Sequence, residues 1–138
     1  MCSSDLLFPR DLDQWQDAAL LERWAALAAV RDQVNLQIEE KRKDKTITAN
    51  LSARVTVEAG GDLGGLLAEY RDFLPTLFGV SEVDLKPSSA QAPAVSVDRA
   101  TGTKCERCWR YVPEVSNVAD RQGLCPRCVE ALAEPVSL

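Results

Sequence analysis

Cys105-Glu106-Arg107-Cys108 and Cys125-Pro126-Arg127-Cys128 are two Cys-x-x-Cys motifs with sixteen residues between them. This spacing is typical of a structural zinc site. A two-residue spacer lets one tight turn present two thiolates, and tetrahedral Zn²⁺ takes four such ligands at about 2.3 Å. The sequence therefore predicts one zinc ion and a small finger built around it, with four ligands: Cys105, Cys108, Cys125 and Cys128.

Two other interpretations of these four cysteines are two disulfides or four idle thiols. The chain contains no histidine, so a mixed Cys/His site is excluded. Four protein ligands fill the coordination sphere and leave no position for a reactive water. We therefore expect a zinc ion that stabilises a fold and performs no catalysis.

The composition is that of an ordinary globular protein, with 46% hydrophobic and 27% charged residues among 138. A net charge of −5 argues against a surface coated with nucleic acid, although it leaves a local basic patch open. No apolar run reaches membrane-spanning length, and no signal peptide is visible. Thiols arranged for a metal fit a reducing compartment, so we expect a cytoplasmic protein without a membrane partner.

Residues 1–6, Met-Cys-Ser-Ser-Asp-Leu, look like a translated sequencing-adapter end. We expect this segment to be non-native and the chain to begin within a longer gene. The alternative is a short native terminus. In both cases Cys2 is the odd cysteine and is not expected to bind metal.

Residues 13–44 are predicted to form one helix about 45 Å long. Asp11 or Asp13 is expected to cap its start. Basic residues at the other end complement the helix dipole; they are Lys41, Arg42, Lys43 and Lys45. A single helix cannot bury its own apolar stripe, and the sequence shows no obvious neighbour for it. The predicted stripe consists of Leu20, Trp24, Leu27, Val34 and Ile38.

Residues 49–99 are predicted to form a small β-α-β-β module. Alternation of apolar and polar residues over 51–58 indicates a half-buried strand. A helix over residues 63–74 follows, with Asp62 as its cap and Pro75 as its end. Two further strands are expected around residues 80–85 and 94–98, joined by a Pro- and Ser-rich linker. The glycines at 60, 61, 64 and 65 lack a phosphate-loop pattern, so we interpret them as a strand-to-helix turn.

Residues 100–138 are predicted to form the zinc finger, similar to a zinc ribbon. Each Cys-x-x-Cys motif is expected at the tip of a hairpin or turn, and residues 129–132 are expected to add one helical turn. A domain this small has little apolar core, so its folding should be coupled to metal binding. The expected fold class is α+β with a long helix, the module and this Cys₄ finger.

The segments flanking the cysteines resemble the C-terminal zinc domain of bacterial isoleucyl-tRNA synthetases. They read Lys104-Cys-Glu-Arg-Cys-Trp-Arg-Tyr111 and Leu124-Cys-Pro-Arg-Cys-Val-Glu-Ala-Leu132. The segments Arg31-Asp-Gln-Val-Asn35 and Leu51-Ser-Ala-Arg-Val55 also match that family's order, so the resemblance covers nearly all of residues 7–132. One departure is at residues 48–52, where the family usually has Gly-x-Ser-Leu-Glu.

The resemblance implies a role in translation. In this family of class I aminoacyl-tRNA synthetases the enzyme attaches isoleucine to tRNA(Ile) using ATP and Mg²⁺. The tail follows a helical anticodon-binding bundle, whose end residues 7–48 would be, and lies on the anticodon side of tRNA. The implied partners are tRNA(Ile) and the rest of the synthetase chain, in an enzyme expected to be a monomer. The His-Ile-Gly-His and Lys-Met-Ser-Lys-Ser types of motif are absent from these residues, so no catalytic residue is predicted here.

Several finger residues are candidates for contact with tRNA. Between Arg99 and Cys128, six basic side chains stand against three acidic ones. Arginines pair with phosphates, and aromatic rings stack on unpaired bases. Two alternatives stay open: Trp109 packs over the sulfurs, and Arg107 and Arg127 bond nearby carbonyls or sulfurs. The basic run at residues 41–45 is a solvated helix end or a phosphate contact. The full set of tRNA-binding candidates is Lys104, Arg107, Trp109, Arg110, Tyr111 and Arg127.

Two functions of other classes compete with this hypothesis. Formamidopyrimidine-DNA glycosylases end in a similar Cys₄ finger, but they usually have glycine where this chain has Trp109. A free-standing zinc-ribbon interaction module would require Met1 to be a true start. It would also leave the apolar stripe of the long helix unexplained.

Overall fold

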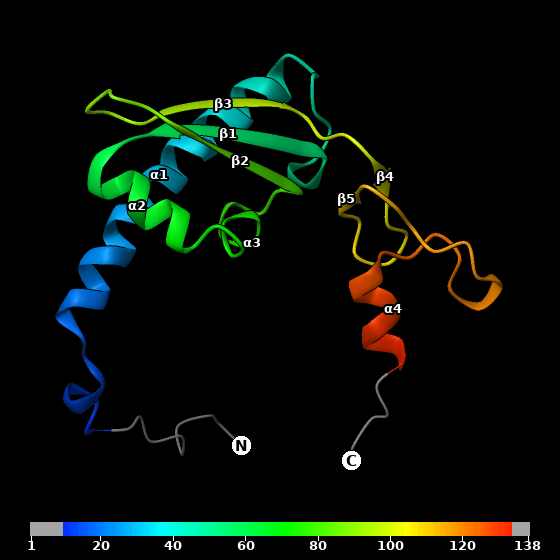
Figure 1. Ribbon diagram of the computed structural model, residues 1–138, viewed down its shortest axis with the longest axis horizontal. Helices are drawn as coiled ribbons and strands as arrows, with labels where there is room; N and C mark the ends of the chain where they lie inside the picture. The colour runs from blue at the N-terminus through cyan, green and yellow to red at the C-terminus, as the bar shows by residue number, and fades with distance from the viewer. Residues whose placement is uncertain (1–9, 134–138) are drawn as a thin grey trace, which may run out of the picture.

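The computed structural model describes residues 10–133, which form a two-layer module of helices and sheet followed by a smaller finger (Figure 1). In Figure 1, α2 and α3 lie below the sheet, α1 passes behind it, and the finger continues on the right. The predicted α+β class is confirmed. The segment predicted to be non-native, residues 1–6, lies outside the described residues.

The long helix α1 spans Ala18–Lys43 and is shorter than predicted. Its 26 residues extend about 39 Å at 1.5 Å per residue. The prediction that Asp11 or Asp13 caps it is wrong. Asp13 begins a separate 3₁₀ turn, Asp13–Trp15, and the backbone is extended at Gln16. The helix then starts at Asp17, whose side chain accepts a hydrogen bond from the Leu20 N–H at 3.0 Å.

The apolar stripe of α1 finds its neighbours within this chain, which the sequence did not reveal. The helix packs along β3, with α2 and α3 beside it. Trp24 is partly buried, with its ring 5.8 Å from those of Tyr70 and Phe73. Leu20 lies on the same stripe but is 41% exposed, because it lies beyond the part of the helix that the sheet covers. The fully buried residues of α1 are Leu27, Val30, Val34 and Ile38.

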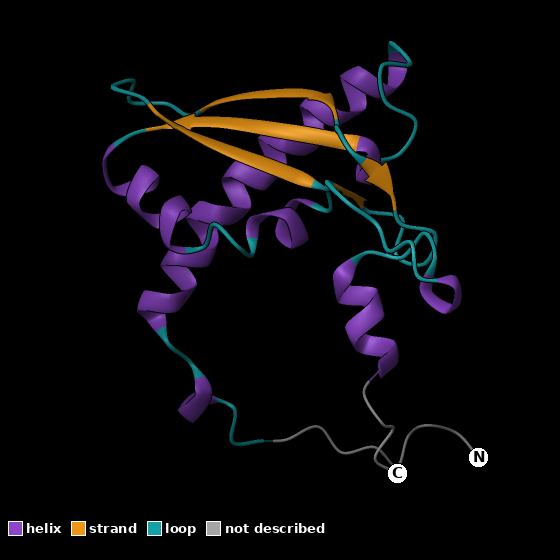
Figure 2. Cartoon of the chain, turned by 45° about the vertical axis from the view of Figure 1, so that its right-hand side comes forward, coloured by secondary structure: helices purple, strands orange, loops and turns teal. Residues whose placement is uncertain are grey.

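The central strand of the sheet is β1, Ala53–Ala59. It pairs in parallel with β2, Glu82–Pro87, and antiparallel with β3, Ala94–Arg99 (Figure 2). The predicted alternation is confirmed, since Ala53, Val55 and Val57 are buried and the residues between them are not. The helices therefore cover one face, and the other faces solvent with a polar row from all three strands: Arg54, Thr56, Glu58, Glu82, Asp84, Lys86 and Asp98.

Two helices, and not the single predicted one, connect β1 to β2. They are α2, Gly61–Glu69, and α3, Leu74–Phe78. The predicted cap is wrong, because Gly60 is the N-cap and Asp62 lies in the first turn. Pro75 lies in the first turn of α3 and does not end a helix. Proline suits that turn because its missing N–H would have no helical partner there. Within residues 10–133, no helix is long and apolar enough to cross a membrane.

The finger begins with a hairpin of β4, Thr103–Lys104, and β5, Tyr111–Val112. Gly102 precedes it with a φ of +98°, and a Cβ there would lie 2.4 Å from the Val112 carbonyl oxygen. Only glycine fits that position. The chain then passes a short 3₁₀ turn, Ala119–Arg121, and ends in α4, Pro126–Ala133. The predicted single helical turn at residues 129–132 is wrong, because α4 already begins inside the second Cys-x-x-Cys motif.

One serine hydroxyl joins the finger to the module. The Ser81 hydroxyl, just before β2, donates to the Leu51 carbonyl at 2.5 Å and accepts from the Tyr111 N–H at 2.8 Å. The entry to β1, the entry to β2 and strand β5 of the finger therefore meet at one atom. Arg110 adds a second link, because its Nη2 donates to the Thr76 hydroxyl of α3 at 3.1 Å.

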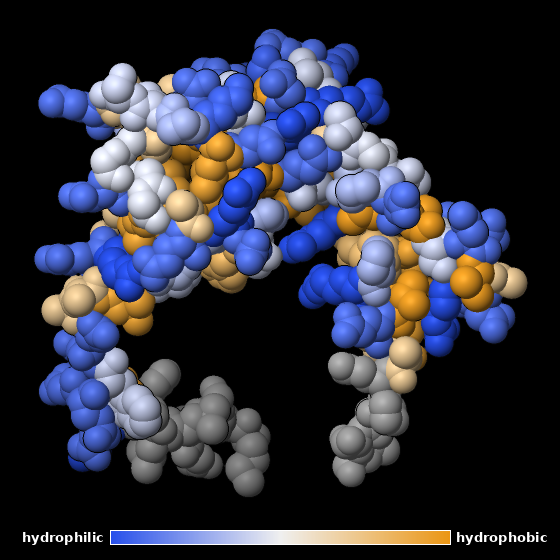
Figure 3. All heavy atoms as spheres, in the orientation of Figure 1, coloured by the Kyte–Doolittle hydropathy of each residue, from blue (hydrophilic) through white to orange (hydrophobic). Residues whose placement is uncertain are grey.

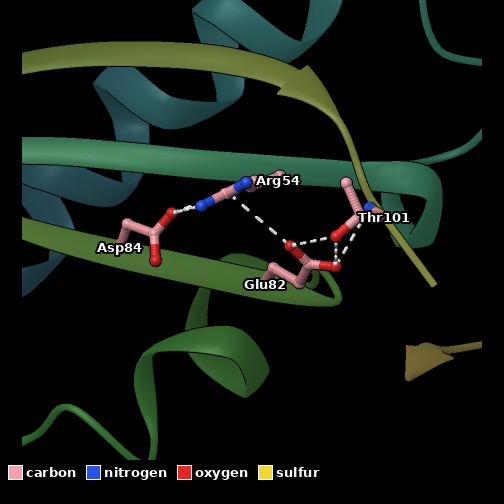
Figure 4. A network of polar contacts seen from close by, with 4 residues as sticks. All are labelled: Arg54, Glu82, Asp84 and Thr101. Atoms are coloured by element: carbon pink, nitrogen blue, oxygen red, sulfur yellow. Dashed lines mark hydrogen bonds and ion pairs between the residues drawn. The ribbon is translucent and has the colours of Figure 1, made fainter. Parts of the chain in front are cut away.

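Carboxylates at the same end of the sheet extend this junction (Figure 4). The Glu82 carboxylate accepts from the backbone N–H of Thr101 at 3.0 Å and from its hydroxyl at 3.1 Å. Arg54 lies between Glu82 and Asp84, with its Nε donating to Asp84 at 2.6 Å. The segment that leads from β3 into the finger is thus held against β2 by hydrogen bonds.

Ser81→Ala should lower the free energy of unfolding by about 1–3 kcal/mol, because it leaves a carbonyl and an N–H without their partner. Zinc content should not change. Chemical denaturation followed by circular dichroism measures the difference. Ser96→Ala, on the exposed part of β3, is the control and should stay within about 0.5 kcal/mol of wild type. Equal stability of the two variants would contradict the role of Ser81.

Candidate metal centre

The four cysteines of the finger converge from two elements. Cys105 and Cys108 lie in the turn between β4 and β5, and Cys125 and Cys128 lie at the start of α4. All four sulfurs lie within 4.8 Å of one another. Cys105, Cys125 and Cys128 are buried, and Cys108 is half-buried. Two segments seventeen residues apart along the chain therefore present one compact set of sulfur donors.

The geometry of this set fits one zinc ion. The Sγ atoms of Cys108 and Cys125 are 3.7 Å apart. Sulfurs at the corners of a tetrahedron, with Zn–S bonds of about 2.3 Å, are about 3.8 Å apart. All four cysteines are free thiols, so the alternative of two disulfides is not what the fold contains. The finger therefore has a closed Cys₄ site for a structural zinc.

Hydrogen bonds from the finger stabilise negative charge on the sulfurs. The Cys125 N–H donates to Cys105 Sγ at 3.2 Å. Arg107 lies between the first two cysteines, and its Nη1 donates to Cys128 Sγ at 3.8 Å. This contact supports the alternative in which Arg107 bonds a sulfur. Such bonds orient a metal ligand and reduce the repulsion between thiolates.

The thiols differ strongly in acidity because they crowd one another. Burial raises the pKa of Cys105, but backbone N–H groups of Cys108, Cys125 and Arg107 outweigh it and lower that pKa to about 6. Burial, assisted by the neighbouring sulfurs, raises the pKa of Cys125 to about 12. Burial is also the main cause of the raised pKa of Cys108. The four groups cannot all ionise without a cation, so zinc binding must displace protons.

Trp109 does not pack over the sulfurs. The apolar side chains against the cluster are Val112 and Leu124. Trp109 is 60% exposed, and Lys104 Nζ lies 5.2 Å from the centre of its ring. Its φ of +65° is a left-handed conformation that disfavours every residue with a Cβ. A large apolar ring is thus held in solvent, at a conformational cost, beside a cation.

The other predicted tRNA-binding residues do not form one cluster. Tyr111 is half-buried, and its backbone is bound to Ser81. Arg110 is bound to Thr76, and Arg107 contacts the sulfur cluster. Arg127 is exposed at the start of α4. The structure brings together Lys104, Trp109 and Tyr111 and leaves Arg127 apart from them.

A small hollow of about 90 Å³ beside Trp109 contains residues that sequence reasoning missed. Lys104, Trp109 and Tyr111 line one side. The other side comes from the loop between α1 and β1 and consists of Thr48, Ala49, Leu51 and Ser52. No local pattern in the sequence predicts that these residues meet the finger, because the contact depends on the tertiary fold.

Known proteins share both the finger and the module. A family model described as "Zinc finger found in FPG and IleRS" matches residues 102–131. An isoleucine–tRNA ligase of Geobacter sulfurreducens is 40% identical over 134 residues, covering 91% of this chain and 14% of that protein. One of Thermotoga petrophila is 37% identical with the same coverage. One of Staphylococcus haemolyticus is 37% identical over 84% of this chain.

The extent of these matches decides between the two kinds of protein that carry this finger. The finger model alone fits both, but the similarity to isoleucine–tRNA ligases continues upstream through the sheet and α1. The glycosylase alternative is therefore not favoured. The chain spans about 14% of the length of these relatives. It belongs to the isoleucine–tRNA ligase family and corresponds to the C-terminal part that carries the zinc finger.

Proposed function

We propose that this chain is the tRNA-contacting tail of an isoleucine–tRNA ligase, an enzyme that attaches isoleucine to tRNA(Ile) in the cytoplasm using ATP. The observation that carries the proposal is the exposed Trp109 ring beside Lys104, on a finger of the isoleucine–tRNA ligase type. ATP and Mg²⁺ act in the catalytic core, to which none of these residues belongs. The tail contributes binding and not chemistry.

The zinc ligands in this proposal are Cys105, Cys108, Cys125 and Cys128. The mutual distances of their sulfurs and the sulfur-directed hydrogen bonds support this assignment. Zinc fixes the turn that ends at Cys108, and Trp109 is the next residue along the chain. The metal therefore determines where the exposed ring lies.

Contact with the anticodon side of tRNA is supported by the chemistry of the finger surface. Exposed aromatic rings stack on unpaired bases, which are plentiful in an anticodon loop. A lysine over the ring adds a charge that attracts the adjacent phosphates. Arg127 is exposed and available for a further phosphate contact.

The rest of the synthetase chain is the second proposed partner. The N-terminal half of α1 and the turn before it expose a group of large apolar side chains: Leu12, Trp15, Leu20 and Leu21. Further helices of an anticodon-binding bundle would cover them. In this division residues 7–48 end that bundle, 49–99 form a junction module and 100–138 form the finger, although α1 and the sheet share one core.

Cys125→Ser should abolish zinc binding, because three thiolates and a hydroxyl make a far weaker tetrahedral site. Wild-type protein should carry one zinc per chain, measured by atomic emission after dialysis. Loss of zinc should unfold the finger and leave the sheet intact, since the core of the module contains none of these cysteines. Full zinc content in the variant would contradict the ligand assignment.

Trp109→Gly should separate stability from function. Glycine relieves the left-handed backbone, so the finger should become more stable by up to about 1 kcal/mol. Binding to a tRNA(Ile) transcript should weaken by about 1–3 kcal/mol, because one stacked base loses its platform. Fluorescence anisotropy with labelled tRNA measures the affinity, and thermal denaturation measures the stability.

Trp15→Ala is the matched control, because it removes another exposed tryptophan, in the turn before α1. Its tRNA affinity should equal that of wild type. A Trp109→Gly protein that binds tRNA normally would overturn the proposed stacking contact. Binding of wild type to a lesion-containing DNA duplex, but not to tRNA, would favour the glycosylase-type function.

A further inference from the structure

The loop that follows α1 starts with a lysine in an unusual conformation. Lys45 has a φ of +57°. Its N–H donates to the Arg42 carbonyl at 3.1 Å, and the Thr46 N–H donates to the Lys41 carbonyl at 3.0 Å. This pair of bonds is a Schellman ending, in which glycine normally occupies the position of Lys45. The chain therefore has a cation where backbone geometry favours a residue without a side chain.

Within residues 10–133, Lys45 and Trp109 are the two non-glycine residues with positive φ. Strained backbone persists where the surrounding structure enforces it and is concentrated at functional sites. One of these residues carries a positive charge and the other a flat aromatic face. These are the two side-chain types that bind the phosphates and bases of single-stranded RNA.

The fold brings the segments of these two residues together, although they are 64 positions apart in the sequence. Thr48 and Ala49, which closely follow Lys45, line the hollow beside Trp109 and Lys104. The loop is held in place, because Ile47 is buried and the Ser52 hydroxyl donates to the Ala49 carbonyl at 2.6 Å. The end of α1 and the exposed face of the finger therefore border one hollow.

The charges around this loop are available to a ligand. Arg42 is paired with Glu39 at 3.0 Å. No ion pair within the described part of the chain engages Lys41, Lys43 or Lys45. Asp44 is exposed between two of these lysines and offsets one charge. The net field at this helix end stays positive.

We infer that the end of α1 and the finger form one composite RNA-binding surface across the hollow. An unpaired base stacks on Trp109, and a phosphate of the same RNA segment lies against Lys45 across the hollow. This inference rests on the proposed function and extends its site from the finger to a second, distant segment. The ligand class is unpaired RNA, such as a loop of tRNA.

The test compares Lys45→Gly, Lys45→Arg and the control Lys86→Ala in tRNA(Ile) binding over a range of salt concentrations. Lys86 is exposed at the other end of the sheet, where β2 ends. Lys45→Gly should weaken binding about three- to tenfold at low salt and reduce the slope of log K against log salt by about 0.7–0.9, the value for one phosphate. Lys45→Arg should keep the slope, and Lys86→Ala should leave both quantities unchanged.

Thermal denaturation separates binding from folding, because Lys45→Gly should be at least as stable as wild type. Weak binding together with a lower melting temperature would overturn the inference. Equal losses in Lys45→Gly and Lys86→Ala would reduce the effect to net charge and overturn it as well. If Trp109→Gly loses affinity and Lys45→Gly does not, the composite surface is refuted while the proposed function stands. If wild type does not bind tRNA, the proposed function itself fails.

Discussion

Repulsion among four buried sulfurs is the constraint on which the finger depends. The cluster is supported by only a few apolar side chains, chiefly Val112 and Leu124. In Figure 3 apolar atoms reach the surface of the finger lobe on the right, as expected of a unit too thin to enclose a core. A divalent cation turns this repulsion into four bonds. The conformations of the hairpin, the start of α4 and the backbone of Trp109 follow from those bonds.

The module is stabilised by different physics. Its core combines the stripe of α1 with β1, β3 and the two short helices, and it needs no metal. Hydroxyl and carboxylate groups, chiefly Ser81 and Glu82, join this core to the finger. Hydrogen bonds are directional, so this junction fixes an orientation with little buried apolar area. A rigid platform thereby positions a finger whose folding depends on zinc.

The sequence predicted those features that depend on local chemistry. The Cys-x-x-Cys spacing predicted the Cys₄ cluster, and alternation over residues 51–58 predicted the central strand. The helix boundaries were less predictable, because Asp13 and Asp17 are equally good caps and tertiary structure selects Asp17. Pro75 was misread for a similar reason: proline both ends helices and begins them.

Contacts between distant segments could not be predicted from the sequence. Ser81 is one of several serines in the chain, and no neighbouring residue marks it as the group that binds both Leu51 and Tyr111. The same holds for the hollow, whose two sides come from residues 48–52 and 104–111. The flanking residues of the cysteines predicted the family, but the structure was needed to show that Trp109 is exposed and strained.

The uncovered face of the sheet also has an electrostatic consequence. Its outward row contains four carboxylates, from Glu58, Glu82, Asp84 and Asp98, against the cations Arg54 and Lys86. A polyanion that drifts toward this face meets a negative field, whereas the end of α1 and the finger offer a positive one. The molecule is thus polarised, and an approaching RNA is turned toward one side before any contact forms.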